Sequence, residues 1–245
     1  MNRKISFPGI SGSTLKLLAM FLMLLDHMWR TVIPGNLWMT CLGRLAFPIF
    51  AFQIAEGYRH TKDIKKYMKR LFIFALISEI PFNCMISGGF IFPFGQNVMF
   101  TLLLGLIAVW QIDILRKCET MKEQLCSLFL LLLISLAAWL GMTDYGLSGV
   151  MTVIVFYLFH DFRYCRLCQL LSLFAVNFFW LEGMQIELSI ANLTVLFPVQ
   201  GFAILALVPI WLYNGQKGWS GKVFQIASYA FYPAHMMLLY LLSYL

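Results

Sequence analysis

Charged side chains are scarce in this sequence. Lys, Arg, Asp and Glu make up 12% of its 245 residues and hydrophobic residues 61%, against about a quarter and about half in soluble domains. This composition excludes an ordinary soluble globular protein and predicts an integral membrane protein. The net charge of +7 does not point to nucleic acid, because a basic excess in membrane proteins is typical of Lys and Arg retained in cytoplasmic loops.

Clusters of metal-binding residues are also lacking. The four histidines are scattered, and of the six cysteines only Cys165 and Cys168 form a C-x-x-C pair. A structural zinc site needs a second such pair or an equivalent set of ligands. We therefore expect reduced cysteines, buried as small apolar side chains, and no metal cofactor.

Long apolar runs dominate what is present. With about 20 apolar residues needed to cross a bilayer, the sequence predicts about nine transmembrane helices, within a range of eight to ten. They cover 14–33, 38–57, 71–87, 97–115, 124–141, 145–160, 167–181, 190–213 and 223–243. The start of the chain resembles a signal peptide, but Lys16 and Asp26 interrupt its apolar run, so we expect a retained first span. The predicted fold is one all-α, membrane-embedded domain over residues 1–245.

The loop charges predict an orientation. Lys and Arg residues lie before the first apolar run, at 58–70, at 116–122, at 163–166 and at 217–222, whereas the loops between these positions contain none. By the positive-inside rule, this alternation places the basic loops and the N-terminus in the cytoplasm. The exceptions are Arg30 and Arg44.

These two arginines fall within apolar helices, where a charge costs a few kcal/mol and normally faces a partner or a polar cavity. Asp26 and His27 precede Arg30 near the external end of the first helix, and Arg44 begins the second helix from the same side. Other helices add polar residues to this external half, namely Glu79, Asn97, Thr101, Asp144 and Tyr145. The topology therefore predicts a polar cluster there.

Several of these residues also have ordinary structural explanations. Asp26 and Arg30 are four residues apart and could neutralise each other on one helical face. Asn97 and Asp144 precede predicted helices and suit helix N-caps. His27 is harder to explain in this way, because a histidine beside acidic, basic and amide groups suits a general base near neutral pH.

A basic segment, YRHTKDIKKYMKR at 58–70, follows the second helix. Such a run usually contacts lipid headgroups and fixes the orientation of the protein. The alternative is a binding site for a polyphosphate ligand, because Lys and Arg match the charge and hydrogen-bond geometry of phosphates. The candidate residues for this site are Glu56, Arg59, His60, Lys65, Lys66 and Arg70.

Five blocks of the sequence resemble the TraX family: TLKLLAMFLMLLDH, the long block from GRLAFPIF to SEIPF, NVMFTLLLGL, DYGLSGV and FYPAHM. The resemblance covers most of the chain. It implies a bacterial multi-pass inner-membrane acyltransferase, related in architecture to the acyltransferase-3 group, with cytoplasmic acetyl-CoA as donor. The family is named for an F-pilin N-acetylase, so the implied acceptor is an amine or hydroxyl, such as the N-terminus of a pilin-like peptide. In the wider group a histidine early in the bundle is the expected base, which falls here on His27.

The residues and the resemblance together predict a mechanism. Segment 58–70 binds the phosphates of CoA, and His27 takes a proton from the acceptor. Arg44 or Asn97 holds the oxyanion, while Asp26 or Glu56 orients neighbouring groups. His235, near mid-membrane in the last helix, is a candidate relay.

Two other classes of function remain open. Buried acidic, basic and histidine side chains in a helical bundle also describe a proton-coupled transporter or flippase. The sequence shows no two halves of similar pattern, which weakens that reading. A scaffold for another membrane protein is the third possibility, favoured if the polar residues pair with one another around no cavity.

Overall fold

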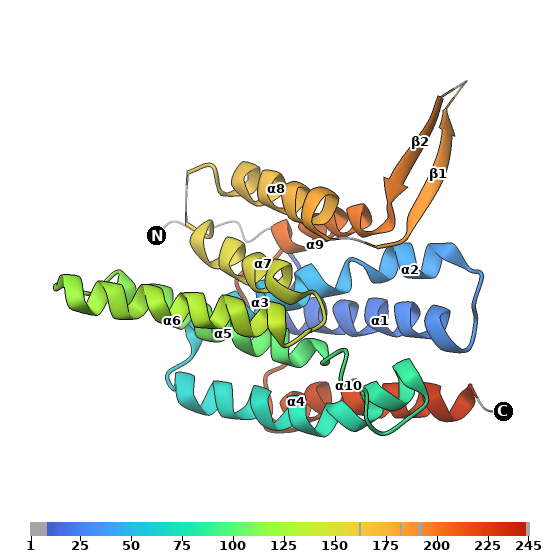
Figure 1. Ribbon diagram of the computed structural model, residues 1–245, viewed down its shortest axis with the longest axis horizontal. Coiled ribbons are helices and arrows are strands. Elements are labelled where there is room, and N and C mark those ends of the chain that lie inside the picture. The colour runs from blue at the N-terminus through green and yellow to red at the C-terminus, as the bar shows by residue number, and fades with distance from the viewer. Residues whose placement is uncertain (1–8, 162, 182, 191–192, 244–245) are drawn as a thin grey trace, which may run out of the picture.

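The computed structural model describes residues 9–161, 163–181, 183–190 and 193–243, and it is a bundle of roughly parallel and antiparallel helices from which one β-hairpin projects (Figure 1). The elements in chain order are α1 (Gly12–Thr31), α2 (Leu37–Gly43), α3 (Ala46–His60), α4 (Ile64–Ser87), α5 (Val98–Leu115), α6 (Met121–Leu140), α7 (Gly146–Leu158), α8 (Cys165–Ala175), η1 (Val176–Trp180), β1 (Gln185–Ile190), β2 (Leu193–Pro198), η2 (Val199–Ala206), α9 (Leu207–Trp211) and α10 (Lys222–Leu242). The prediction of an all-α bundle is confirmed apart from the hairpin.

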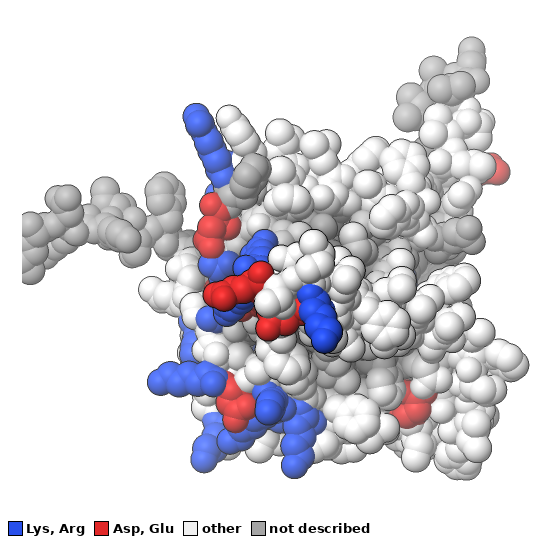
Figure 2. Space-filling model, turned by 60° about the vertical axis from the view of Figure 1, so that its left-hand side comes forward, with Lys and Arg blue, Asp and Glu red and all other residues white. Residues whose placement is uncertain are grey.

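The chain runs back and forth between two ends of the bundle. The loops that follow α3, α5, α7 and α9 meet at one end, on the left of Figure 1. These loops and the helix ends next to them contain the charged segments 59–70, 116–122, 163–166 and 217–222. Figure 2 looks toward this end, where Lys and Arg side chains gather. We call it the basic end and the opposite one the far end. Arg3 and Lys4, which also entered the orientation argument, lie outside the described residues.

Within the described part of the chain, four helical segments are long and apolar enough to cross a membrane by length and composition: Leu37–His60, which joins α2 and α3, Ile64–Ser87, Val98–Leu115 and Met121–Leu140. Shorter apolar helices cover Gly146–Leu158, Cys165–Trp180 and Val199–Trp211. Much of α6 faces outward with large apolar side chains such as Phe129 and Leu132, which are 58% and 54% exposed. An apolar outer surface of this kind indicates a membrane protein.

The predicted helix over 190–213 is wrong in its first part. Residues Gln185–Ile190 and Leu193–Pro198 pair as an antiparallel hairpin, with Gln185 opposite Pro198. The alternation of apolar and polar residues in QIELSI has the period of a strand, and an average hydropathy conceals it. Pro198 ends the second strand, and the chain then returns as η2 and α9.

The helices α3, α5 and α7 pack closely where they meet. Gly149 of α7 faces Thr101 of α5, which is fully buried, and Phe47 of α3. A Cβ atom at position 149 would overlap Thr101 Cγ2 and lie 2.9 Å from Phe47 Cζ. These helices can therefore approach closely only because residue 149 has no side chain.

Replacing Gly149 with Ala is expected to lower the free energy of unfolding by about 1–3 kcal/mol, the usual cost of overpacking a core. Thermal unfolding in detergent, followed by tryptophan fluorescence, measures the change. Gly89→Ala is the matched control, since the nearest atom to its Cβ would be Ser87 Oγ at 3.8 Å. Equal melting temperatures for the two variants would contradict the close packing of α7 against α5.

Candidate functional site

Two histidines meet between the first and last helices. His27 of α1 and His235 of α10 are joined by a 2.7 Å contact between His27 Nδ1 and His235 Nε2. The ring planes differ by 9° with centroids 4.9 Å apart. Because parallel rings stacked face to face cannot approach to 2.7 Å, the two imidazoles lie edge to edge in nearly one plane, which is hydrogen-bond geometry. Sequence analysis named both histidines as candidate site residues, but it could not predict that they contact each other.

An ion pair lies beside the histidines, between α1 and the junction of α2 and α3. Asp26 Oδ1 accepts hydrogen bonds from Arg44 and, at 2.7 Å, from Thr40 Oγ1. Gly43 allows α2 to approach α1 here, since a Cβ at that position would lie 2.9 Å from Asp26 Oδ1. Among the described residues the ion-pair partner of Asp26 is therefore Arg44 and not Arg30, so the alternative of a pairing within α1 is not what the structure shows.

The arginine of this pair keeps one unused donor. Arg44 Nε is buried and has no hydrogen-bond partner within the described part of the chain. His27 lies close enough to Arg44 and to the exposed Arg30 to experience their charges, and both arginines also act on Asp144. A buried guanidinium N–H without an acceptor suits a group that carries negative charge only during a reaction.

A third polar group lies between α4 and α5. Asn97, fully buried, donates to Ala75 O at 2.8 Å and to Glu79 Oε2 at 2.5 Å, and accepts from Met99 N at 3.1 Å. Asn97 is thus the N-cap of α5, as the sequence suggested. Its amide is already occupied by these bonds, so it is a poor candidate for holding an oxyanion.

The start of α7 completes the surroundings of the ion pair. Thr101 Oγ1 donates to the backbone carbonyl of Asp144, and the ring of Tyr145 stacks on Phe47 with centroids 3.9 Å apart. Tyr145 itself precedes α7 with a φ of 65°, and the helix has no side-chain cap. The expectation that Asp144 caps this helix is therefore wrong. Asp144 is exposed instead, beside the two arginines.

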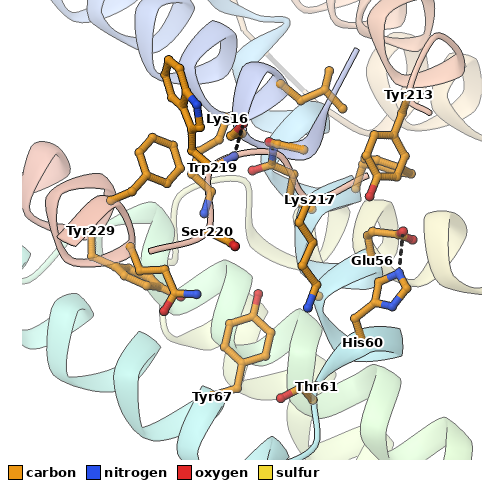
Figure 3. Close-up of a pocket in the computed structure, with 18 of the residues that line it drawn as sticks. Lys16, Glu56, His60, Thr61, Tyr67, Tyr213, Lys217, Trp219, Ser220 and Tyr229 are labelled. Carbon is orange, nitrogen blue, oxygen red and sulfur yellow. Dashed lines mark hydrogen bonds and ion pairs between the residues drawn. The ribbon is translucent and has the colours of Figure 1, made fainter. Parts of the chain in front are cut away.

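A cavity of roughly 450 Å³ opens at the basic end (Figure 3). Its positive side chains are Lys16, Lys62, Arg70 and Lys217, and His60 lies beside them. Its aromatic side chains include Tyr67, Tyr213, Trp219 and Tyr229, and among the described residues that line it Glu56 is the only carboxylate. Figure 3 shows Lys217 reaching inward from the loop before α10. Lys16 and Arg70 lie near enough for their charges to interact. Cations gathered around one opening indicate a binding site for an anion.

The loop that carries Lys217 is fixed to the start of α1. Gly12 N and Ser13 N donate to the carbonyls of Gln216 and Lys217 at 2.8 and 2.9 Å, and Trp219 N donates to Ser13 Oγ at 3.0 Å. These bonds satisfy backbone groups that a helix start leaves free. They also hold Lys217 and Trp219 over the cavity.

The carboxylate of the cavity is held by two histidines. Glu56 Oε1 lies 3.0 Å from His60 Nε2, and Glu56 Oε2 lies 3.2 Å from His160 Nε2. Next to them, contacts with His160 and Arg59 lower the pKa of Asp161 below its ordinary value. Burial, assisted by the charge of Glu56, raises the pKa of Tyr213 to about 12. Arg59 is thus engaged by Asp161 on the rim of the bundle and does not line the cavity.

A narrower space of roughly 100 Å³ continues from the cavity toward the histidines. It shares Lys16, Gln53, Tyr67 and Tyr229 with the cavity. Its other lining is mostly apolar and reaches Met20, Met23, Phe50, Ile54, Leu71, Val98, Met99, Leu102, Ser228 and Tyr232. Met23 is one helical turn before His27, and the ring of Tyr232 is 5.9 Å from that of His235 between centroids. The passage therefore ends about one helical turn short of His27, beside Tyr232, and neither histidine is among the described residues that line it.

Two groups contain most of the predicted site residues that lie near the cavity and the passage. The first group lies near the inner end of the passage and consists of His27, His235, Asp26, Arg44, Arg30 and Asp144. The second group lines the cavity and consists of Glu56, His60 and Arg70. Lys65 and Lys66 are exposed and do not line it. Sequence analysis missed Lys16 and Lys217 as site residues. The one available signal was Lys16, a lysine within an apolar helix.

Comparison with known proteins identifies the relatives of this chain. The family model described as TraX protein matches residues 11–243, which is nearly the whole chain. The chain belongs to the TraX family. A curated relative, the probable fimbrial assembly protein FimC of serogroup H1 from Dichelobacter nodosus, is 30% identical over 254 aligned positions that cover 98% of this chain and 97% of the relative. No solved structure shows a significant match.

Proposed function

We propose that this TraX-family membrane protein is an acyltransferase that moves an acetyl group from acetyl-CoA, bound at the basic end, to an amine or hydroxyl acceptor beside His27. The observation that carries the proposal is a basic, aromatic cavity that continues as a narrow apolar passage to within about one helical turn of the histidine pair. A CoA thioester has the same three parts in the same order: a nucleotide with phosphates, a slender arm and a reactive end.

The cavity chemistry suits the nucleotide part of the donor. Arg70 lies over the ring of Tyr67, with its Cζ 5.7 Å from the centroid, and Arg70 Nε is buried without a partner among the described residues. Lysine and arginine side chains bind phosphates by charge-assisted hydrogen bonds, and exposed aromatic rings such as Trp219 offer faces on which a base can stack. The candidate phosphate ligands are therefore Lys16, Lys62, Arg70 and Lys217, with Lys65 and Lys66 outside the cavity.

The passage suits the arm of the donor. One face of α1 carries a stripe of four residues, Lys16, Met20, Met23 and His27. They follow one another at spacings of four, three and four residues, which places them on the same side of a helix. From Lys16 to His27 this stripe covers about 16 Å at 1.5 Å per residue, a length that an extended pantetheine arm can follow. The thioester of a donor whose phosphates lie at Lys16 therefore falls near His27.

The chemistry follows from the groups around that position. His27 takes a proton from the acceptor nitrogen or oxygen as it attacks the thioester carbon. The negative charge that develops on the carbonyl oxygen is stabilised by the free N–H of Arg44, which Asp26 holds in place. The C–S bond then breaks, the proton passes to the sulfur, and CoA leaves through the passage by which it entered.

The acceptor class rests on the relatives. The curated relative is described as a fimbrial assembly protein, and the TraX resemblance implies acetylation of a pilin. A subunit of a pilus-like fibre, presenting an N-terminal amine near the far end, is therefore the acceptor we propose. The protein would lie in a bacterial inner membrane with its basic end in the cytoplasm, where acetyl-CoA is made. The proposal also includes about nine transmembrane helices and an architecture related to that of the acyltransferase-3 group.

Transport and scaffolding are the alternatives. A transporter of the inverted-repeat type binds substrate between two related halves, whereas the two connected spaces here extend inward from one end. A scaffold protein does not need a passage that leads from a surface cavity into the helical bundle, so the presence of this passage argues against the scaffold alternative. The unsatisfied donor of Arg44 also favours a reaction site over a fully paired structural core.

The proposal is tested first by binding of CoA to the purified protein in lipid nanodiscs. The double variant Lys16→Gln/Lys217→Gln is expected to raise the Kd for CoA at least about tenfold, since each charge-assisted hydrogen bond contributes roughly 1.5–3 kcal/mol. Lys122→Gln is the matched control, because Lys122 is exposed at the same end but does not line the cavity.

Release of CoA from acetyl-CoA, measured with and without a pilin-like peptide, tests the transfer itself. Release that depends on the peptide amine, with an acetylated peptide as product, supports the enzyme. Failure of the folded wild-type protein to bind CoA would overturn the proposal, and so would equal Kd values for the double variant and Lys122→Gln.

A further inference from the structure

The histidine pair continues into the backbone of α10. His235 Nδ1 lies 2.8 Å from the carbonyl oxygen of Phe231, one turn earlier in the helix. His235 is 5% exposed, and the ring of Phe231 stacks on it with centroids 4.7 Å apart and planes 14° apart. The orientation of the His235 ring is therefore fixed on one side by packing and at Nδ1 by a backbone acceptor.

This contact determines where the protons of the pair lie. A carbonyl oxygen can only accept, so His235 Nδ1 carries the proton and donates to Phe231. In a neutral imidazole the other nitrogen then has no proton, so His235 Nε2 is an acceptor. The 2.7 Å contact to His27 must therefore be a hydrogen bond donated by His27 Nδ1.

We infer that His235 is a positioning residue that holds His27 in the tautomer with its proton on Nδ1. The unprotonated Nε2 of His27 is then the one nitrogen free to take a proton from an acceptor. A histidine in water prefers the opposite tautomer, with the proton on Nε2, and that form would present a donor where the reaction needs a base. An orienting partner for a catalytic histidine serves the same purpose in other acyl-transfer enzymes.

The inference deepens the proposed function, because it assumes that His27 is the base. It changes the role given to His235, which does not touch the reactants. His235 acts only through His27 and sets both the tautomer and the direction of its ring. Phe231 is part of the same arrangement through its carbonyl, which a side-chain substitution does not remove.

The kinetic test compares His235→Leu with His235→Gln. Leucine fills the space without an acceptor, and its kcat is expected to fall at least about tenfold, with the KM for acetyl-CoA changed less than about twofold, since His235 does not touch the donor. Glutamine can place its amide oxygen near the former Nε2, so His235→Gln should recover part of the lost kcat. Equal kcat values for wild type and His235→Leu would overturn the inference.

A spectroscopic test needs no activity. In protein labelled with ¹⁵N-histidine and placed in lipid, the nitrogen chemical shifts distinguish protonated from unprotonated ring nitrogens, and His27→Gln identifies the His27 signals. We expect Nδ1–H for both residues in the wild type, and a signal from Nε2–H of His27 in His235→Leu. A wild-type His27 protonated on Nε2 would refute the inference even if transfer occurs. Absence of transfer with the expected shifts would remove the proposed function alone.

Discussion

Replacing His27 with Gln is expected to lower the rate of acetyl transfer by at least about a hundredfold, the usual contribution of a general base. Glutamine is close in size to histidine, and its amide can still donate to His235, so the packing between α1 and α10 should survive. It cannot take a proton at the pH of the reaction. The loss should therefore appear in kcat, while binding of CoA at the basic end stays within about twofold of wild type.

The measurement is single-turnover transfer from acetyl-CoA to a peptide amine in nanodiscs. Lys122→Gln is the control, because Lys122 is exposed at the basic end and does not line the cavity; its rate should stay within about twofold of wild type. Retention of the wild-type rate by folded His27→Gln protein would remove His27 as the base. The search would then turn to proton transport through the same polar groups.

The sequence predicted the position of the polar residues better than their pairing. Apolar helices that contain Asp26, His27 and Arg44 are conspicuous, because the membrane makes isolated charges costly. Partners, however, depend on which helices lie side by side. His27 and His235 are 208 residues apart, and Asp26 could have paired with Arg30 within its own helix. Helix spacing alone cannot decide between a partner on the same helix and one on a neighbour.

The basic cavity shows a second reason why a sequence reveals a site incompletely. The run at 58–70 was visible as a cluster of charges, yet only part of it lines the cavity, since Lys65 and Lys66 point elsewhere. Lys16 and Lys217 join it because backbone bonds attach the loop before α10 to the start of α1. Such contacts leave no periodic pattern in either segment.

The hairpin was missed for a different reason. Residues 190–213 were assigned to one helix on hydropathy, which averages over a window and does not register alternation. The segment in fact contains β2, η2 and α9. Pro198 ends β2 and directly precedes η2, and proline is unfavourable in helix interiors.

Replacing Asp26 with Asn is expected to destabilise the protein by about 3–5 kcal/mol, the typical cost of leaving one member of a buried ion pair without its partner. The side chains of Asp26 and Arg44 are 15% and 23% exposed, so water can compensate little of the lost charge. Asparagine keeps the shape and can still accept from Thr40, and the change therefore isolates the effect of the charge. Arg44→Gln should be similarly costly, because it leaves the carboxylate without its counter-ion.

Unfolding in detergent, followed by tryptophan fluorescence, gives the free energies. Arg59→Gln is the control, since Arg59 pairs with Asp161 on an exposed rim where side chains are 30% and 69% accessible, and such pairs contribute about 1 kcal/mol or less. The double variant Asp26→Asn/Arg44→Gln should lose less stability than the sum of the two single variants, because it leaves no unpaired charge. Additive losses would mean that the two residues do not act as a pair, and Asp26 could then not be the group that holds Arg44 beside His27.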